Sequence, residues 1–582
     1  MIRRLLLVAA AVLVAAACDK PGGEQEQPAA LGVPQGVVLH SATETSLTFQ
    51  WKVVEGATGY AWKLTLDGAL AKEGSASGRN VTVSGLAKGT TYGFSVCAVK
   101  GAEKSAYSTE ISAKTEGKAG EEPAPAEAVC VDAPIVIPFD STPVLGTSGL
   151  IRVLKADGTE VDRIDLADIA TVDILSDGTM IPKGADADNG KIAINNDYVY
   201  NTFMDALHSG QYRVVHYTPL RVSARALEIK LHNEALDYGT TYTVKVDESV
   251  VGKAVEDITL TTKAKPSGDV VRVAADGSGD FCTVQGALSF VSANVGKDAA
   301  VTIEVANGTY RELLFLRNKN NVTIKGASRS GVVIAYPNND SYETGSGGST
   351  SSKPSAGRSI GKSGGRSLFL VESCDNLVLQ DLTIENTYSI PSHKGQAEAI
   401  YFNSAHRLTV ENCSLISWQD TFLCKGKVWV HNSLIAGHCD YIWGYPEVCL
   451  FEDCEIRSRA AGYIVQARVQ SAANKGFVFL NCRLTAEDGV GSGKMYLARS
   501  AGQTDCIDNV VYVNCSMDAV IRAEGWLGSP APNPSAPTAT SGWREYGSTG
   551  AGASSARNAY GRTLTASEAE PYLSKAAVLG SF

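Results

Sequence analysis

The stretch "RLTVENCSLISWQDTFLCKGKVWVHNS", residues 407–433, contains the same unit twice. A run of β-forming residues ends at Asn412, and a second run ends at Asn432, 20 residues later. Similar runs recur between residues 269 and 582, as "LTIENT", "LTVENC", "VWVHNS", "CLFEDC", "FVFLNC" and "VVYVNC", with the Asn or Asp at positions 386, 412, 432, 453, 481 and 514. One strand returning at the same phase every ~20–30 residues is typical of a parallel β-helix. The sequence therefore predicts such a solenoid over residues 269–582.

Two aspartates within this repeat region are surrounded in sequence by apolar residues. Asp420 in "SWQDTFL" and Asp440 in "CDYIWG" are 20 residues apart, and Gln396 precedes Gln419 by 23 residues. Because these intervals approximate one coil, the four residues are expected on successive coils of one face, with the carboxylates about one strand spacing, ~5 Å, apart. Like charges so close force their pKa values apart, which leaves one protonated acid and one carboxylate. Such a pair suits catalysis better than structure.

The motifs on this face resemble those of the pectin methylesterases. "SWQDTFL" resembles the family's Gln-Asp-Thr motif, "CDYIWG" its Asp-Phe-Ile-Phe-Gly motif, and "GQAEAI" its Gln-Ala-Val-Ala segment. Residues 276–288 and 307–314 resemble the family's opening coils, and residues 519–526 and 544–553 its closing ones. The resemblance covers roughly residues 269–570. It implies a right-handed parallel β-helix that hydrolyses methyl esters of galacturonate in pectin, releasing methanol and pectate, without a metal or organic cofactor.

The same resemblance implies a role for each residue of the face. Asp440 would be the nucleophile, and Asp420 the general acid for departing methanol and then the base for water. Gln396 and Gln419 would donate N–H groups to the developing oxyanion. Arg499 matches the arginine of the family's Leu-Gly-Arg-Pro-Trp motif and is expected to pair with Asp440.

Three aromatic residues are candidates for substrate contact. Tyr441 and Trp443 replace two phenylalanines of the family's nucleophile motif, while "LARSA" at 497–501 lacks the family's substrate-contacting tryptophan. Trp526 in "EGWLG" is a candidate either for the core or for a platform beneath a sugar ring. These changes leave the preferred methylation pattern of the substrate open.

Other functions of β-helix proteins fit the sequence less well. A polygalacturonase also uses paired carboxylates, but that family's Asp-Asp, Gly-His-Gly and Arg-Ile-Lys motifs are missing from the sequence. A pectate lyase would need an acidic calcium cluster, and no such run of residues accompanies Asp420 and Asp440. A lipid-anchored pectin-binding protein without activity is the remaining alternative, against which the five retained site residues argue.

The first residues read as a targeting segment. "MIRRLLLVAAAVLVAAAC" has two arginines, a 13-residue apolar run and then Cys18 after small residues. This pattern indicates a secretory signal over residues 1–17 and resembles the lipobox of bacterial lipoproteins, in which Cys18 is acylated; an ordinary signal cut nearby is the alternative. Residues 18–30 are expected to be a flexible tether. We expect an exported protein that is anchored by lipid to a bacterial membrane, the outer one, and that faces the periplasm or the cell surface.

Two β-sandwich modules are expected before the β-helix, so that the whole chain is all-β. Residues 31–115 resemble a fibronectin type III domain, with Trp51 in the core and Tyr92 as a corner residue. After a linker at 116–128, residues 129–265 repeat the L-x-x-G-T-T-Y pattern, which indicates a bacterial Ig-like module. A spacer role and weak glycan binding are both open for the two modules.

Charge and cysteine content restrict the partners further. A net charge of −10 argues against nucleic acid and favours methylated, less acidic stretches of pectin. The 13 cysteines contain no C-x-x-C pair, so a zinc site is not expected. Their recurrence at one phase favours stacked buried thiols, although Cys439, Cys449 and Cys454 are near enough in sequence for one disulfide.

Overall fold

The computed structural model describes residues 31–43, 45–116, 128–168, 172–174, 180–182, 204–207, 213–216, 219–223, 225–339, 365–388 and 395–582. The expected signal segment, Cys18 and the tether lie outside the described residues. The chain divides into two compact units, Met1–Ala126 and Glu127–Phe582. Within the described residues, no helix combines the length and the apolar character needed to cross a membrane.

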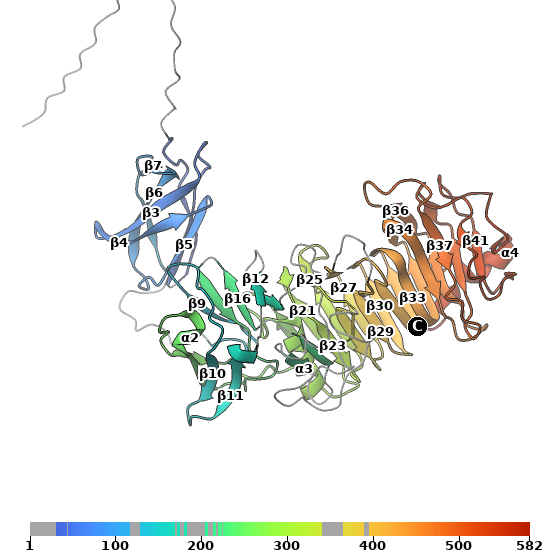
Figure 1. Ribbon diagram of the computed structural model, residues 1–582, viewed down its shortest axis with the longest axis horizontal. Coiled ribbons are helices and arrows are strands. Elements are labelled where there is room, and N and C mark those ends of the chain that lie inside the picture. The colour runs from blue at the N-terminus through green and yellow to red at the C-terminus, as the bar shows by residue number, and fades with distance from the viewer. Residues whose placement is uncertain are drawn as a thin grey trace, which may run out of the picture. The chain divides into compact units, whose positions relative to one another are not determined.

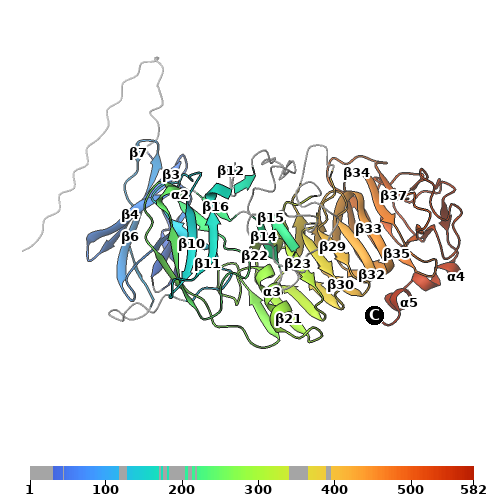
Figure 2. The ribbon, with the colours of Figure 1, turned by 60° about the horizontal axis from the view of Figure 1, so that its bottom comes forward.

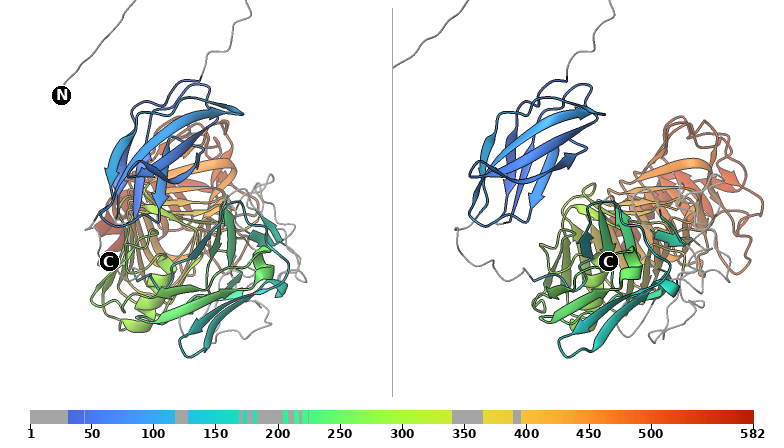
Figure 3. Two further views of the ribbon diagram at one scale, coloured as in Figure 1. Left: turned by 90° about the vertical axis from the view of Figure 1, so that its left-hand side faces the viewer. Right: turned by 60° about the vertical axis from the view of Figure 1, so that its left-hand side comes forward.

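The first unit is an antiparallel β-sandwich (blue in Figure 1 and Figure 3). One sheet contains β1 (Val38–Ala42), β2 (Ser46–Gln50) and β5 (Asn80–Ser84), and the other contains β4 (Ala69–Ala76), β3 (Gly59–Leu66), β6 (Thr91–Lys100), β7 (Glu103–Lys104) and β8 (Ile111–Lys114). Trp51 is buried, with its ring 5.2 Å from that of Tyr60 and 6.1 Å from that of Phe94. The Tyr92 hydroxyl accepts a hydrogen bond from the Ala87 amide at 2.9 Å. Trp51 and Tyr92 therefore have the core and corner roles predicted for a fibronectin type III domain.

The second unit begins with another sandwich. Its sheets contain β9 (Ile135–Pro138), β16 (Leu220–Ser223) and β17 (Ala226–Ile229), and β11 (Glu160–Asp165), β10 (Leu150–Lys155), β18 (Thr241–Val246) and β19 (Ile258–Thr261). The short elements η1 (Leu166–Asp168), α2 (Glu248–Val251), β12 (Val172–Ile174), β13 (Met180–Pro182), β14 (Met204–Leu207) and β15 (Arg213–His216) accompany them. The Tyr242 hydroxyl accepts from the Asp237 amide at 2.8 Å, the same corner as in the first sandwich. The repeated sequence pattern thus produces a repeated local structure.

A 23-stranded sheet, β20–β42, follows and winds into a parallel β-helix (Figure 2). Its strands are β20 (Val270–Val273), β21 (Val301–Val305), β22 (Gly308–Tyr310), β23 (Leu314–Arg317), β24 (Val322–Gly326), β25 (Val332–Tyr336), β26 (Phe369–Glu372), β27 (Leu377–Gln380), β28 (Thr383–Asn386), β29 (Ile400–Asn403), β30 (Arg407–Glu411), β31 (Ser414–Ile416), β32 (Phe422–His431), β33 (Leu434–Glu452), β34 (Glu455–Ala467), β35 (Gly476–Leu480), β36 (Arg483–Ala486), β37 (Met495–Arg499), β38 (Val510–Val513), β39 (Ser516–Met517), β40 (Trp526–Leu527), β41 (Trp543–Tyr546) and β42 (Gly561–Thr563). Strand β24 pairs with β21 on one side and β27 on the other, both in parallel, so one coil comprises three strands.

Apolar side chains stack along the inside of the coils. One buried column, aligned by strand register, consists of Leu377, Leu408, Val428, Cys449, Phe477 and Val510. Helix α3 (Val284–Asn294) packs its buried residues against the first coils. The elements α4 (Ala566–Ala569), η2 (Glu570–Tyr572) and α5 (Lys575–Leu579) cover outward-facing apolar residues of β33, β35 and β38 near the other end (Figure 2).

An Asn and Asp ladder marks one corner of the solenoid. Its members have positive φ angles of 46° to 56° and are Asp381, Asn412, Asn432, Asp453, Asn481 and Asn514. This left-handed conformation suits Asn and Asp, whose short polar side chains bond locally. The alignment of Asn386 with this ladder was wrong: Gln380 pairs with Glu411, so Asp381 is the residue level with Asn412. The coil on which this ladder begins has Asp381 followed by Leu382 in place of Asn and Cys, which shifted the alignment by one strand.

Stacked thiols accompany the ladder, as expected. Cys413, Cys454, Cys482 and Cys515 are buried, and each Sγ donates to the carbonyl two residues earlier at 3.2 to 3.5 Å. The twelve described cysteines are free thiols, so the disulfide considered for residues 439–454 is not present.

Candidate active site

Asp420 and Asp440 occupy equivalent positions on consecutive coils. Single parallel bridges connect Gln396 to Gln419 and Gln419 to Cys439, and the Asp420 amide donates to the Cys439 carbonyl at 3.0 Å. Both aspartates have positive φ angles, 64° and 47°, and each is 3% exposed. Backbone conformations of this kind are costly for side chains other than Gly, Asn and Asp and concentrate at functional sites. The coil spacing thus brings the two carboxylates onto one face of the solenoid.

Asp440 is held by an arginine and a glutamine from later coils. Arg499, at the end of β37, donates from Nε to Oδ1 at 2.7 Å and from Nη2 to Oδ2. Gln466, in β34, donates from Nε2 to Oδ2 at 2.8 Å. Hydrogen bonding to Asp440 raises the pKa of Arg499, so the guanidinium remains charged. These three bonds fix the orientation of the carboxylate.

Asp420 has different surroundings. Its Oδ2 accepts from Gln396 Nε2 at 3.0 Å and from Arg366 Nη2 at 3.2 Å. Burial, and after it the charge of Glu398, raises the pKa of Asp420 well above its usual range, while Arg366 acts in the opposite direction. Repulsion from Asp440 also raises the pKa, but it is smaller than the two first causes. These surroundings favour the protonated form of Asp420, for a reason that the sequence pattern indicated only in part.

The two glutamines predicted to form the oxyanion hole lie on the same face. Gln396 and Gln419 are partly exposed and face one another across the bridge between their coils. The amide oxygen of Gln396 accepts from Arg366 Nη1, which directs its Nε2 toward Asp420.

Four residues of this face were missed from sequence: Arg366, Glu398, Gln466 and Arg468. Gln466 lies 26 residues after Asp440, about one coil, so the interval used for the other residues could have identified it. Glu398 stands in "GQAEAI" where the family has Val. Arg468 donates from Nε to Gln466 Oε1 at 2.9 Å and so orients that amide. No sequence motif marks Arg366.

The three aromatic residues expected to contact substrate do not lie where a sugar could reach them. Tyr441 is 0% exposed, and its hydroxyl is 3.5 Å from Ser458 Oγ in the core. Trp526 is 1% exposed and stacks on Trp543 at 5.4 Å. Trp443, 4% exposed, packs under two arginines. The prediction of substrate contact is wrong for Tyr441 and Trp443, which fill the core and the layer beneath the site. For Trp526 the structure favours the core over the sugar platform, the two alternatives that the sequence left open.

Trp526→Ala tests this correction. Removing a buried indole from the stack is expected to lower the free energy of unfolding by about 3–5 kcal/mol, with no change in KM for the substrate. Denaturant unfolding and steady-state kinetics measure the two quantities. Unchanged stability together with a raised KM would return Trp526 to the substrate site.

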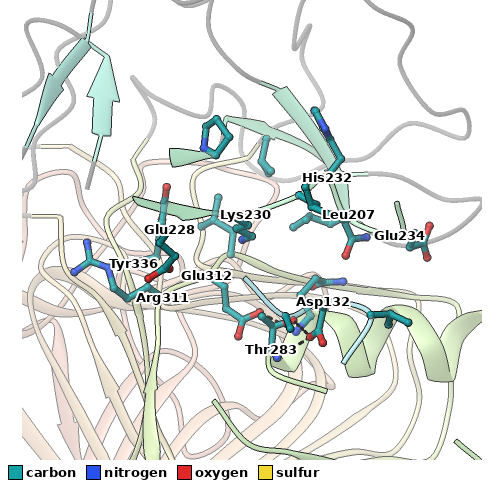
Figure 4. A pocket seen from close by; sticks show the side chains of 18 of the residues that line it. Asp132, Leu207, Glu228, Lys230, His232, Glu234, Thr283, Arg311, Glu312 and Tyr336 are labelled. Atoms are coloured by element: carbon teal, nitrogen blue, oxygen red, sulfur yellow. Dashed lines mark hydrogen bonds between the residues drawn. The ribbon is translucent and has the colours of Figure 1, made fainter. Parts of the chain in front are cut away.

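A separate hollow lies between the second sandwich and α3 (Figure 4). Two of its carboxylates serve the helix: Glu312 accepts from the amides of Val284 and Gln285 at 2.9 and 2.8 Å, and Asp132 accepts from the Thr283 amide at 2.7 Å. Burial raises the pKa of Glu312 to about 7. Asp132 also groups with two thiols as potential metal ligands, but its oxygens are already committed to backbone and hydroxyl donors. The hollow therefore has a structural explanation and contains none of the candidate catalytic residues.

Comparisons with known proteins find relatives of the first sandwich and of the β-helix. The family model "Pectinesterase" matches residues 269–580, and the model "Fibronectin type III domain" matches residues 32–114. Pectinesterase 31 of Arabidopsis thaliana is 35% identical over 264 residues, which cover 44% of this chain and 76% of the relative. Pectinesterase A of Emericella nidulans is 26% identical over 321 residues, covering 55% and 89%. The solved pectin methylesterase of Erwinia chrysanthemi is 23% identical, covers 55% of this chain and 98% of its own, and has a TM-score of 0.44.

The family match covers the β-helix from its first coil to its last helix, and the three motifs that contain Gln396, Asp420 and Asp440 lie side by side on consecutive coils. The chain therefore belongs to the pectinesterase family, as a parallel β-helix enzyme that hydrolyses the methyl esters of pectin.

Proposed function

We propose that this chain hydrolyses methyl-esterified galacturonate through Asp440 as nucleophile and Asp420 as acid and base. The observation that supports this assignment is the unequal treatment of two carboxylates on one face. Asp440 receives two bonds from a guanidinium and one from an amide, whereas burial and Glu398 keep the proton on Asp420. One group is thus prepared to attack and the other to donate a proton.

In the first half of the reaction, a carboxylate oxygen of Asp440 forms a bond to the ester carbonyl carbon. The N–H groups of Gln396 and Gln419 stabilise the negative charge on the carbonyl oxygen. The bond to the methoxy oxygen then breaks, and Asp420 gives its proton to that oxygen, so methanol leaves.

In the second half, Asp420 is a carboxylate and accepts a proton from water. The water oxygen attacks the acyl carbon, and the bond to Asp440 breaks. Asp440 returns to a carboxylate, Asp420 regains its proton, and the product is a free galacturonate carboxyl group.

The products separate this reaction from those of other pectin-active β-helix enzymes. Incubation with highly methylated pectin is expected to release methanol and acid in equal amounts, without new reducing ends and without unsaturated products. New reducing ends would indicate a polygalacturonase, and unsaturated ends would indicate a lyase. Binding without any of these products would indicate a pectin-binding protein that has lost its activity.

The raised pKa of Asp420 predicts the pH dependence. Asp420 must carry its proton for the first half of the reaction, so kcat/KM is expected to fall as pH rises through that raised pKa. The pH profile of methanol release, measured by an assay that does not depend on pH indicators, reports this alkaline limb. A rate that continues to rise with pH would contradict the assignment of Asp420 as the acid.

Export and lipid anchoring complete the proposal. They rest on residues 1–18, with two arginines, an apolar run and Cys18 after small residues. The enzyme would then act at a bacterial membrane on pectin outside the cytoplasm. Cys18→Ala is expected to move the protein from the membrane fraction to the soluble exported fraction; retention in the membrane fraction would exclude the anchor at Cys18.

A further inference from the structure

A buried ion pair stands beside the proposed acid. Arg366 Nε and Glu398 Oε1 are 2.8 Å apart, and the two side chains are 7% and 0% exposed. A buried pair of this kind seldom adds net stability, because desolvating both charges costs about as much as their attraction returns. The neighbours of Glu398 in the chain, Ala397 and Ala399, are both apolar and 0% exposed, so the charge stands in an otherwise apolar stretch. The pair therefore calls for an explanation beyond folding.

Each nitrogen of the Arg366 guanidinium donates to a different side chain. Nε bonds Glu398, Nη1 donates to the amide oxygen of Gln396, and Nη2 donates to Asp420 Oδ2 at 3.2 Å. An amide whose oxygen is held in this way can only present its nitrogen to Asp420, at 3.0 Å, and to the neighbouring oxyanion position. The guanidinium also lies 5.5 Å from the ring centroid of Trp443, which limits its movement.

We propose that Arg366 and Glu398 act together as positioning residues for the proposed acid, Arg366 by fixing the Gln396 amide and Asp420, and Glu398 by balancing the charge of Arg366. This inference rests on the proposed function of Asp420. It assigns to Arg366, which no motif marks, and to Glu398 a defined part in the same reaction.

The charge balance explains why both members are needed. A lone guanidinium 3.2 Å from Asp420 would favour the carboxylate and remove the proton before methanol needs it. Glu398 offsets that effect, and the other charged groups that act on Asp420 are Asp440 and Arg468. Cys439, on the next coil, has a thiol pKa raised to about 12 by burial and by Asp440, so it remains neutral. Once Asp420 has given up its proton, Arg366 stabilises the resulting carboxylate.

Two variants test the pair. Glu398→Gln keeps the shape and removes the balancing charge. Its alkaline limb of kcat/KM is expected to move to lower pH by about one unit or more, with KM within about two-fold of wild type since no bond to substrate is lost. A limb at the wild-type pH would overturn the proposal.

The double variant Arg366→Met with Glu398→Leu removes both charges and leaves an apolar filling of similar volume, which buried ion pairs generally tolerate. The alkaline limb of kcat/KM in this double variant is expected at a pH close to that of wild type. Its kcat is expected to fall about ten-fold, because the Gln396 amide is no longer held. Wild-type kcat in this variant would overturn the positioning role, even if Glu398→Gln fails to fold. Asp440→Asn, assayed in parallel, distinguishes failure of this inference from failure of the proposed function. Activity in Asp440→Asn would exclude the proposed mechanism. Inactivity of Asp440→Asn together with wild-type kinetics of the two pair variants would exclude only the positioning role of Arg366 and Glu398.

Discussion

Asp440→Asn is expected to reduce methanol release from methylated pectin by about 10⁴-fold or more, because an amide cannot attack the ester carbonyl. The fold is expected to persist. Asn adopts the positive φ of this position readily, as Asn412 and Asn432 do at 50° and 46° on the corner ladder. Circular dichroism and the midpoint of unfolding measure the fold, and gas chromatography of methanol measures the reaction.

Asp453→Asn is the matched control. Asp453 belongs to the ladder with a φ of 54°, and its side chain is about half exposed. The same chemical change in the same backbone conformation is expected to leave kcat and KM at wild-type values. Turnover by Asp440→Asn comparable with that of the control would exclude Asp440 as the nucleophile.

Asp420→Asn is expected to lower the rate on methyl esters by about 10³-fold, since methanol must then leave without a proton donor. An ester whose alcohol is already a good leaving group, such as a nitrophenyl ester, does not need that proton. We expect this ester to give a burst of one equivalent of alcohol and then to stall, because the water step has lost its base. Steady turnover of both esters at wild-type rates would assign the acid and base roles to another residue.

The repeat in the sequence was sufficient to predict the solenoid and the meeting of Asp420 with Asp440. Stacked coils repeat the position of a residue at each turn, so intervals of 20 to 23 residues translate directly into neighbours. The interval does not report which way a side chain points. The positive φ of Asp440 interrupts the alternation of the strand, and Tyr441 consequently faces the core.

The positioning pair shows the other limit of the pattern. Glu398 was visible in its motif, but its partner Arg366 lies 32 residues earlier, on a coil whose length no repeat defines. A charged residue within an apolar motif indicates that it has a buried partner, but the motif does not identify which residue that partner is. The cause of the raised pKa of Asp420 was consequently attributed to Asp440 alone, whereas burial and Glu398 contribute more.

The covalent intermediate offers the most direct test of the central claim. Asp420→Asn is mixed with a short, fully methylated galacturonate oligomer or its activated ester, quenched in acid during the stalled phase and digested for mass spectrometry. The account predicts an acyl adduct, equal in mass to the substrate less its alcohol, on the peptide that contains Asp440. Alcohol release without an adduct, or an adduct on a different residue, would contradict it.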